Sequence, residues 1–247
     1  MTTPAPAPPM PDHSIEPVGE RCLLIRLGEQ VSVQTSRLVH AVTALLLKRA
    51  LPGVMDVVPA FTSVAVYFDP MQFSPRRGLP SAQLTAAIAE TLAGGVPEQS
   101  TRGRLVVVPA CYGGEFGPDL NEVAQTCGLE PEEVIALHSG VPLTVYAFFF
   151  SPGNSFAGPV DPRLQVPRRR SPRTRVEAGT VAIANGITSI YQATSPGGWN
   201  LLARTPWNMF DVDATPPTRL EPGDRMQFRP IGVDEFHALN ERREARP

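Results

Sequence analysis

The spacing of apolar residues in the first part of the chain switches between the period of a strand and that of a helix. Short apolar runs and two-residue alternation predict strands, and apolar positions three and four residues apart predict helices. The predicted elements are a strand within 15–27, a helix over 31–50, two strands over 54–68 divided near Pro59, a helix over 81–92 and a strand over 105–110. This order predicts a ferredoxin-like sandwich, with both helices on one face of the sheet.

The second part of the chain begins with two short helices. Asp119 fits the N-cap of a helix over 120–127, with Glu122 three residues later, and Pro131 fits the first turn of a helix that ends at Gly140. Short apolar strands follow at 144–150, 180–184, 187–193, 199–204 and 225–230, and an irregular segment at 151–179 separates the first of them from the rest. Many short strands of this kind predict a closed or nearly closed β-barrel.

The fold class is therefore α+β, in two domains. We expect a disordered, proline-rich leader at 1–13, a ferredoxin-like domain at 14–100 and a β-barrel domain at 104–240. The leader lacks the basic start and apolar run of a secretory signal, and no apolar run is long enough to span a bilayer. Three cysteines without CxxC spacing argue against a disulfide framework and favour the cytoplasm.

Charge and composition exclude several kinds of chemistry. The net charge of −2 gives no general attraction to nucleic acid or to anionic membranes. Lys48 is the only lysine in the chain, so the sequence has neither a P-loop nor a lysine suited to biotin attachment. If ATP or biotin takes part in a reaction, another polypeptide carries it. Histidine pairs with metal-ligand spacing are absent as well, so we expect no metal site.

A run of arginines within the irregular segment is the strongest candidate for an anion site. Guanidinium groups bind carboxylate, carbonate or phosphate through paired hydrogen bonds. The alternative is a solvated basic loop. The run consists of Arg168, Arg169, Arg170, Arg173 and Arg175.

Two glycine-containing turns could present backbone N–H groups. Pro152-Gly153 follows a buried strand, and Ser195-Pro196-Gly197-Gly198-Trp199 joins two strands. The Pro152-Gly153 segment could equally be an ordinary turn. The SPGGW segment could equally be a hairpin turn with Trp199 in the core. The segment at 153–158 is close to a GxSxG nucleophile elbow, but its last glycine comes one residue late and no helix is predicted after it. We interpret His138 as a helix C-terminal residue that interacts with the helix dipole, and we identify no catalytic residue.

Seven motifs occur in one order along the chain, and together they resemble a known family. They are GGEFGPDL at 113–120, PEEVIALH at 131–138, PG at 152–153, DPRLQVPRR at 161–169, PRTRVEAG at 172–179, SPGGW at 195–199 and RTPWNMFD at 204–211. The set resembles the family that includes the B component of 5-oxoprolinase, allophanate hydrolase subunit 1 and a sporulation kinase inhibitor, a carboxyltransferase domain with subdomains C and D. The resemblance implies a ferredoxin-like domain followed by a cyclophilin-like barrel.

The resemblance also implies two kinds of function. One is a hydrolase half-site that serves ATP-dependent opening of 5-oxoproline or carboxyl transfer to a urea-like amide. This role requires a homologous second subunit, of the same type as the C component of 5-oxoprolinase or allophanate hydrolase subunit 2. A third subunit is compatible with it, and ATP is bound with or by the partners. The other function is inhibition of a sensor histidine kinase.

We expect the site to bind an anionic group through Arg173 and Arg175, with Asp161 orienting their loop. Backbone N–H groups near Gly153, Gly197 and Gly198 would stabilise negative charge on an amide or carboxyl oxygen. The chain departs from the family pattern at Asn154, Ser155 and Ile187, and also at Glu177. Such changes in a pocket can alter which substrate binds, or abolish activity.

Overall fold

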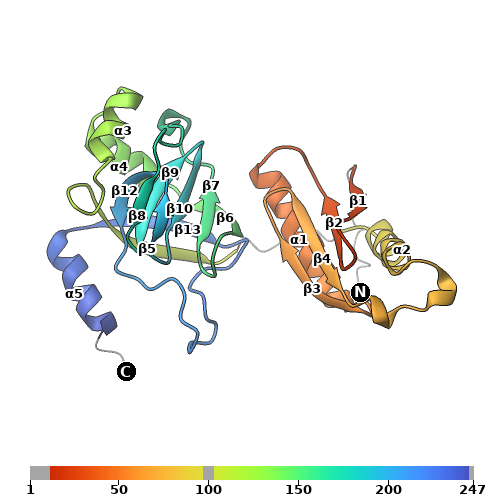
Figure 1. The fold of residues 1–247 in the computed structure, drawn as a ribbon. Helices are drawn as coiled ribbons and strands as arrows, with labels where there is room; N and C mark the ends of the chain where they lie inside the picture. The colour runs from red at the N-terminus through yellow and green to blue at the C-terminus, as the bar shows by residue number, and fades with distance from the viewer. Residues whose placement is uncertain (1–11, 97–102, 245–247) are drawn as a thin grey trace, which may run out of the picture. The chain divides into compact units, whose positions relative to one another are not determined.

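The computed structural model describes residues 12–96 and 103–244, and the chain divides into two compact units, 1–101 and 102–247 (Figure 1). Most of the expected leader lies outside the described residues, and so do positions 97–102 near the expected domain boundary. Across the described part of the chain, no helix combines the length and the apolar character needed to cross a membrane.

The first unit is a four-stranded antiparallel sheet packed against two helices. Its sheet order is β1-β2-β4-β3. The elements are β1 (Ser14–Pro17), β2 (Cys22–Arg26), α1 (Val33–Arg49), β3 (Val54–Pro59), β4 (Ser63–Phe68), 3-10 turns at Pro70–Gln72 and Pro75–Arg77, and α2 (Pro80–Ala93). Ser32 caps α1, because its side chain accepts a hydrogen bond from the Thr35 N–H. Alternate residues of β2 and β4 pack with Val39 of α1 and Ile88 of α2 in one apolar core.

The strand that the sequence places last in this sheet belongs to the other unit. β5 (Leu105–Tyr112) pairs with β13 and β12 of the barrel, and β1 occupies the edge beside β2. The strand order that counts the 105–110 strand into the sandwich is therefore wrong, although the expected domain boundary at 104 assigns this strand to the second domain. The spacing of apolar residues shows that a strand exists, but it does not show which sheet the strand joins. β1 occupies the edge of this sheet because a short local hairpin joins it to β2. The ferredoxin-like description of this unit stays a prediction.

The second unit contains a closed barrel of seven strands, as predicted. The order around it is β10-β7-β6-β13-β5-β12-β9, closed by antiparallel pairing of β9 with β10. The strands and helices beyond β5 are α3 (Leu120–Cys127), α4 (Pro131–Ser139), β6 (Leu143–Phe148), β7 (Ser155–Gly158), β8 (Arg173–Val176), β9 (Thr180–Ala184), β10 (Ile187–Ile190), β11 (Ser195–Gly197), β12 (Asn200–Arg204), β13 (Arg225–Ile231) and α5 (Val233–Glu244).

The segment at 151–179 is more regular than the sequence predicts. It contains β7, a 3-10 turn at Pro162–Leu164 and β8, which pairs with β11 in a two-stranded ribbon. β7 is only four residues long and buried on both faces, so it lacks the apolar alternation that would identify it. The ribbon matters for function because it places the arginine run beside the SPGGW turn.

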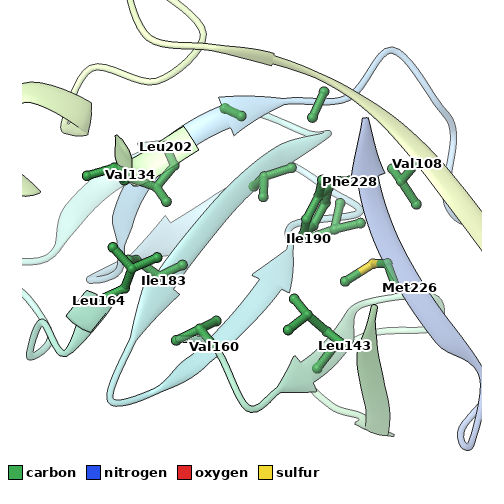
Figure 2. Close-up of a cluster of buried hydrophobic side chains, with 14 of the residues drawn as sticks. Val108, Val134, Leu143, Val160, Leu164, Ile183, Ile190, Leu202, Met226 and Phe228 are labelled. Atoms are coloured by element: carbon green, nitrogen blue, oxygen red, sulfur yellow. The ribbon is translucent and has the colours of Figure 1, made fainter. Parts of the chain in front are cut away.

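An apolar cluster fills the barrel. Figure 2 shows side chains of the barrel strands together with Val134 of α4 and Leu164 of the 3-10 turn in this cluster. Ile183, Ile190 and Leu202 are fully buried, and burying a side chain of this size stabilises a fold by roughly 1.5–3 kcal/mol. Because the interior is packed with side chains, ligand chemistry must lie on the ends and outer surface of the barrel.

Candidate functional site

The ribbon of β8 and β11 brings the arginine run against the SPGGW turn. Arg173 pairs with Gly197 across the ribbon, and the Arg169 backbone N–H donates to the Gly198 carbonyl at 2.8 Å. Asn200 Nδ2 donates to the Pro167 carbonyl, also at 2.8 Å. The segment at 167–175, which we call the arginine loop, is thus held by the Asn200 side chain near its start and by backbone pairing with the SPGGW turn at Arg169 and Arg173. It is an ordered surface rather than a loose basic loop.

Asp119 is the buried anion beneath this surface. Its carboxylate accepts hydrogen bonds from Arg173 Nη2 at 2.6 Å and Nη1 at 3.0 Å, from Arg169 Nη1 at 3.1 Å and from the Leu201 N–H at 2.7 Å. Only 3% of its side chain is exposed. Asp119 is the N-cap residue of α3, as predicted, and its carbonyl accepts from the Val123 N–H at 2.9 Å, but its side chain makes no capping bond. Glu122 instead binds Arg169, with Nη1 and Oε2 at 2.8 Å.

Arg175 and Asp161 take other partners. Arg175 pairs with Glu177, with Nε and Oε1 2.6 Å apart on the exposed surface. Asp161 pairs with Arg163, and the hydrogen bonds from Arg163 lower the pKa of Asp161 to about 2. Of the residues predicted for the anion site, the structure brings together Arg173, Gly197 and Gly198. Asp161 orients the side chain of Arg163, rather than the loop of Arg173 and Arg175 as the sequence predicted.

Gly153 is required for a close backbone approach. Its φ is +75°, and an added Cβ would lie 2.7 Å from the Met209 carbonyl oxygen. Asn154 closes the same turn, since its Nδ2 donates to the Phe149 carbonyl at 3.0 Å. The Oγ atom of Ser155 is buried and has no hydrogen-bond partner in the described structure. This turn is therefore tightly constrained, and its backbone contacts are with the segment at Met209 rather than with the β8–β11 ribbon.

Tyr191 is a site residue that the sequence reasoning did not identify. It follows β10, and its hydroxyl lies against Gly197. Burial raises the pKa of Tyr191, while the charge of Arg168, a hydrogen bond from the Trp199 N–H and the charge of Arg173 oppose that rise. A phenol hydroxyl near two guanidinium groups can hydrogen-bond a carbonyl or carboxylate oxygen. The only signal for Tyr191 in the sequence is that it follows Ile187-Thr188-Ser189-Ile190, a segment that begins at one of the departures from the family pattern.

Aromatic side chains border the arginine loop. The Arg168 guanidinium lies 5.6 Å from the centre of the Trp199 ring, and Trp199 packs edge-on against Phe156 at 5.4 Å. Phe149 and Phe150 continue the cluster, and Phe150 is 80% exposed. Trp199 itself is 7% exposed, so it serves both as a core residue and as the support for Arg168. This combination of a cation, a phenol and a flat apolar wall suits a small planar ligand with an anionic or amide oxygen.

His138 is neutral and belongs to a buried hydrogen-bond network. Thr188 Oγ1 donates to the Ala182 carbonyl at 3.1 Å, so it accepts from His138 Nε2 at 2.9 Å. Nδ1 then carries no proton and accepts from the Tyr112 hydroxyl at 2.7 Å. Burial lowers the pKa of His138 to about 3. His138 lies in the last turn of α4, as predicted, but its neutral ring gives no charge–dipole interaction there.

Replacing Gly197 with alanine should destabilise the second unit by about 1–3 kcal/mol, because the added Cβ meets Tyr191 and lies 2.8 Å from its ring atom Cζ. Gly198→Ala is the matched control, since its Cβ would lie 3.5 Å from Pro172. Both tryptophans, Trp199 and Trp207, lie in the second unit, so urea unfolding followed by tryptophan fluorescence measures that unit alone. Equal midpoints for the two variants would contradict the contact between Tyr191 and Gly197.

Within residues 12–96 and 103–244, no group of three or more histidine, cysteine, aspartate or glutamate side chains could hold a metal ion.

Comparisons with known proteins identify relatives over most of the chain. The chain is 38% identical to the 5-oxoprolinase B component of Bacillus subtilis (strain 168) over 233 residues, an alignment that covers 93% of this chain and 97% of that protein. It is 31% identical to the 5-oxoprolinase B component of Escherichia coli O157:H7, over 86% of this chain and 94% of that protein. The crystal structure of TTHA0988 matches with a TM-score of 0.73 and 38% identity, over 85% of this chain and 40% of that protein.

The family described as carboxyltransferase domain, subdomain C and D, matches residues 13–220. The motifs that suggested this family lie within that range. Because the match spans most of the sequence, and the Bacillus relative is matched over nearly its whole length, this chain belongs to the carboxyltransferase domain, subdomain C and D, family.

Proposed function

We propose that this chain is one subunit of a heteromeric, ATP-dependent amidohydrolase that opens the cyclic amide 5-oxoproline. The observation that carries the proposal is the 38% identity to the B component of 5-oxoprolinase, over 97% of that protein. The site is completed by a homologous second subunit, and ATP is bound with or by the partner subunits. Biotin is not attached to this chain, because its one lysine, Lys48, lies in α1 and not at a hairpin tip. The free thiols of Cys22, Cys111 and Cys127 suit a cytoplasmic complex.

In this proposal the arginine loop and the SPGGW turn bind the substrate. Both terminal nitrogens of Arg173 already bind the Asp119 carboxylate, so this side chain holds the surface in place and adds positive charge near the substrate. Arg168 is exposed above Trp199 and can pair with a substrate carboxylate. Tyr191 and backbone N–H groups at the Gly197-Gly198 turn would stabilise negative charge that develops on the amide oxygen.

This arrangement is a half-site. It offers binding and electrostatic stabilisation, and among the described residues it places no carboxylate or imidazole suited to general base catalysis next to Arg168 and Tyr191. The groups that activate ATP and water would come from the partner subunits, which is why turnover should require them.

Arg168→Ala should lower turnover by the reconstituted complex about 10- to 100-fold, which corresponds to about 1.4–2.7 kcal/mol of transition-state stabilisation. The fold should be preserved, because Arg168 makes no ion pair among the described residues. The assay is ATP-dependent release of glutamate from 5-oxoproline, with urea and small lactams as alternative substrates. The matched control is Arg76→Ala, an exposed arginine of the first unit.

The test begins with co-expression of this chain and the genomic candidate for its second subunit. Turnover that Arg168→Ala reduces and Arg76→Ala leaves unchanged would support the proposal. A stable, folded complex that turns over none of the substrates would contradict the assigned activity. Full turnover by Arg168→Ala would contradict the assigned site and leave the activity standing.

A further inference from the structure

A cavity lies between α5 and the barrel, and its lining contains none of the residues of the arginine loop. Its volume is about 280 Å³. It is bounded by α5, the turn that follows β5 and the end of β12. The residues that matter for its chemistry are Glu115, Phe116, Arg204, Phe236, His237 and Asn240.

The cavity contains one cation and one anion that do not pair with each other. Arg204 Nε donates to the Ala178 carbonyl at 3.1 Å, which fixes the orientation of the guanidinium group. Its terminal Nη1 and Nη2 groups donate no hydrogen bond to any of the described residues. The nearby carboxylate of Glu177 binds Arg175 instead. Glu115 is exposed and takes part in none of the ion pairs found among those residues. The lining thus offers a fork for a carboxylate and a separate acceptor for an ammonium group.

Two phenylalanine rings form the apolar part of the lining. The rings of Phe116 and Phe236 lie 4.5 Å apart, and each residue is only 6% exposed. His237 lies edge-on to both rings. Together they form a wall that fits an aliphatic stem, while the Asn240 amide and the His237 imidazole add hydrogen-bonding groups.

We propose that this cavity is a binding site for a free α-amino acid. Such a ligand carries a carboxylate for Arg204 and an ammonium group for Glu115 on the same carbon, and its side chain would rest on Phe116 and Phe236. A cavity of about 280 Å³ is at the small end of ligand pockets, which suits a molecule of this size and not a nucleotide. The inference does not depend on the proposed hydrolase activity, because it concerns a different surface of this chain.

The experiment is isothermal titration calorimetry of the full chain with L-alanine, L-leucine and L-glutamate. Propionate and ethylamine are matched probes, since each keeps one of the two charged groups of alanine. At least one amino acid should bind with a Kd of about 1 mM or tighter, and the single-charge probes should bind about tenfold or more weakly. No binding by any of the amino acids up to about 10 mM, or equal binding by propionate, would overturn the inference.

Two variants assign the binding to this cavity. Glu115→Gln changes an exposed side chain and should raise the Kd about tenfold or more without affecting the fold. Arg204→Gln should do the same, and its urea midpoint shows whether it remains folded. Glu132→Gln, on the exposed face of α4, is the control and should bind as the unaltered protein does. Unchanged affinity in Glu115→Gln would overturn the inference even if Arg204→Gln fails to fold.

Discussion

Lowering the pH from about 6.5 toward 3 should reduce the free energy of unfolding of the second unit by about 1.4 kcal/mol per pH unit through His138 alone. The pKa of this histidine is about 3 in the folded chain and about 6.5 when it is solvated. Above pH 6.5 both states are neutral at this position. Below it the unfolded chain binds a proton that the folded chain does not, so stability falls with pH until the folded pKa is reached.

Burial explains the low pKa of His138. The His138 side chain is buried, and its ring stacks on the ring of Phe228 with the centroids 4.7 Å apart. Nδ1 of the neutral His138 ring accepts from the Tyr112 hydroxyl. Between pH 6.5 and 3 the titration of His138 therefore lowers the free energy of unfolding by about 5 kcal/mol in total. This loss is a large part of the stability of an ordinary domain.

Urea unfolding followed by tryptophan fluorescence between pH 7 and 4 measures this effect. His138→Gln removes the titrating group, so its stability should vary less with pH than that of the unaltered protein. His237→Gln replaces an exposed histidine and should keep the original slope. Parallel slopes for the unaltered protein and His138→Gln would show that burial does not lower the pKa of His138 in the folded chain.

The barrel was predictable from sequence because its strands are short, apolar and separated by recognisable turns. The β9–β10 hairpin is an example, since Asn185 and Gly186 both have positive φ, at 50° and 77°, as a two-residue type I′ turn requires. The sheet that each strand joins was less predictable. β5 and β13 pair in parallel although more than a hundred residues separate them, and no local pattern encodes that contact.

The candidate site was only partly predictable for a related reason. The arginine run and the SPGGW turn were visible as motifs, but their mutual contacts depend on the β8–β11 ribbon. Asp119 illustrates the difficulty: its position before α3 is what a capping residue shows in sequence, yet its carboxylate binds arginines fifty or more positions away. Local rules interpret a side chain by its neighbours in sequence, and here the partners come from tertiary structure.

Asp119→Ala should destabilise the second unit by about 3–5 kcal/mol. The substitution removes the shared acceptor of Arg169 and Arg173, whose side chains are each 28% exposed, and leaves the buried Leu201 N–H without its partner. Two guanidinium groups would then face each other without the counter-charge they share. The arginine loop should loosen together with the SPGGW turn, so ligand binding there should weaken as well.

An exposed ion pair provides the comparison. Arg229 and Glu235 are 50% and 46% exposed, and Nη2 lies 2.7 Å from Oε1. Glu235→Ala should therefore cost less than about 1 kcal/mol, since water screens that pair. Added salt should reduce the small effect of Glu235→Ala while leaving most of the Asp119→Ala effect, because buried charges are screened less than exposed ones. If the two variants had similar urea midpoints, Asp119 would not be the anion that holds the arginine loop in place.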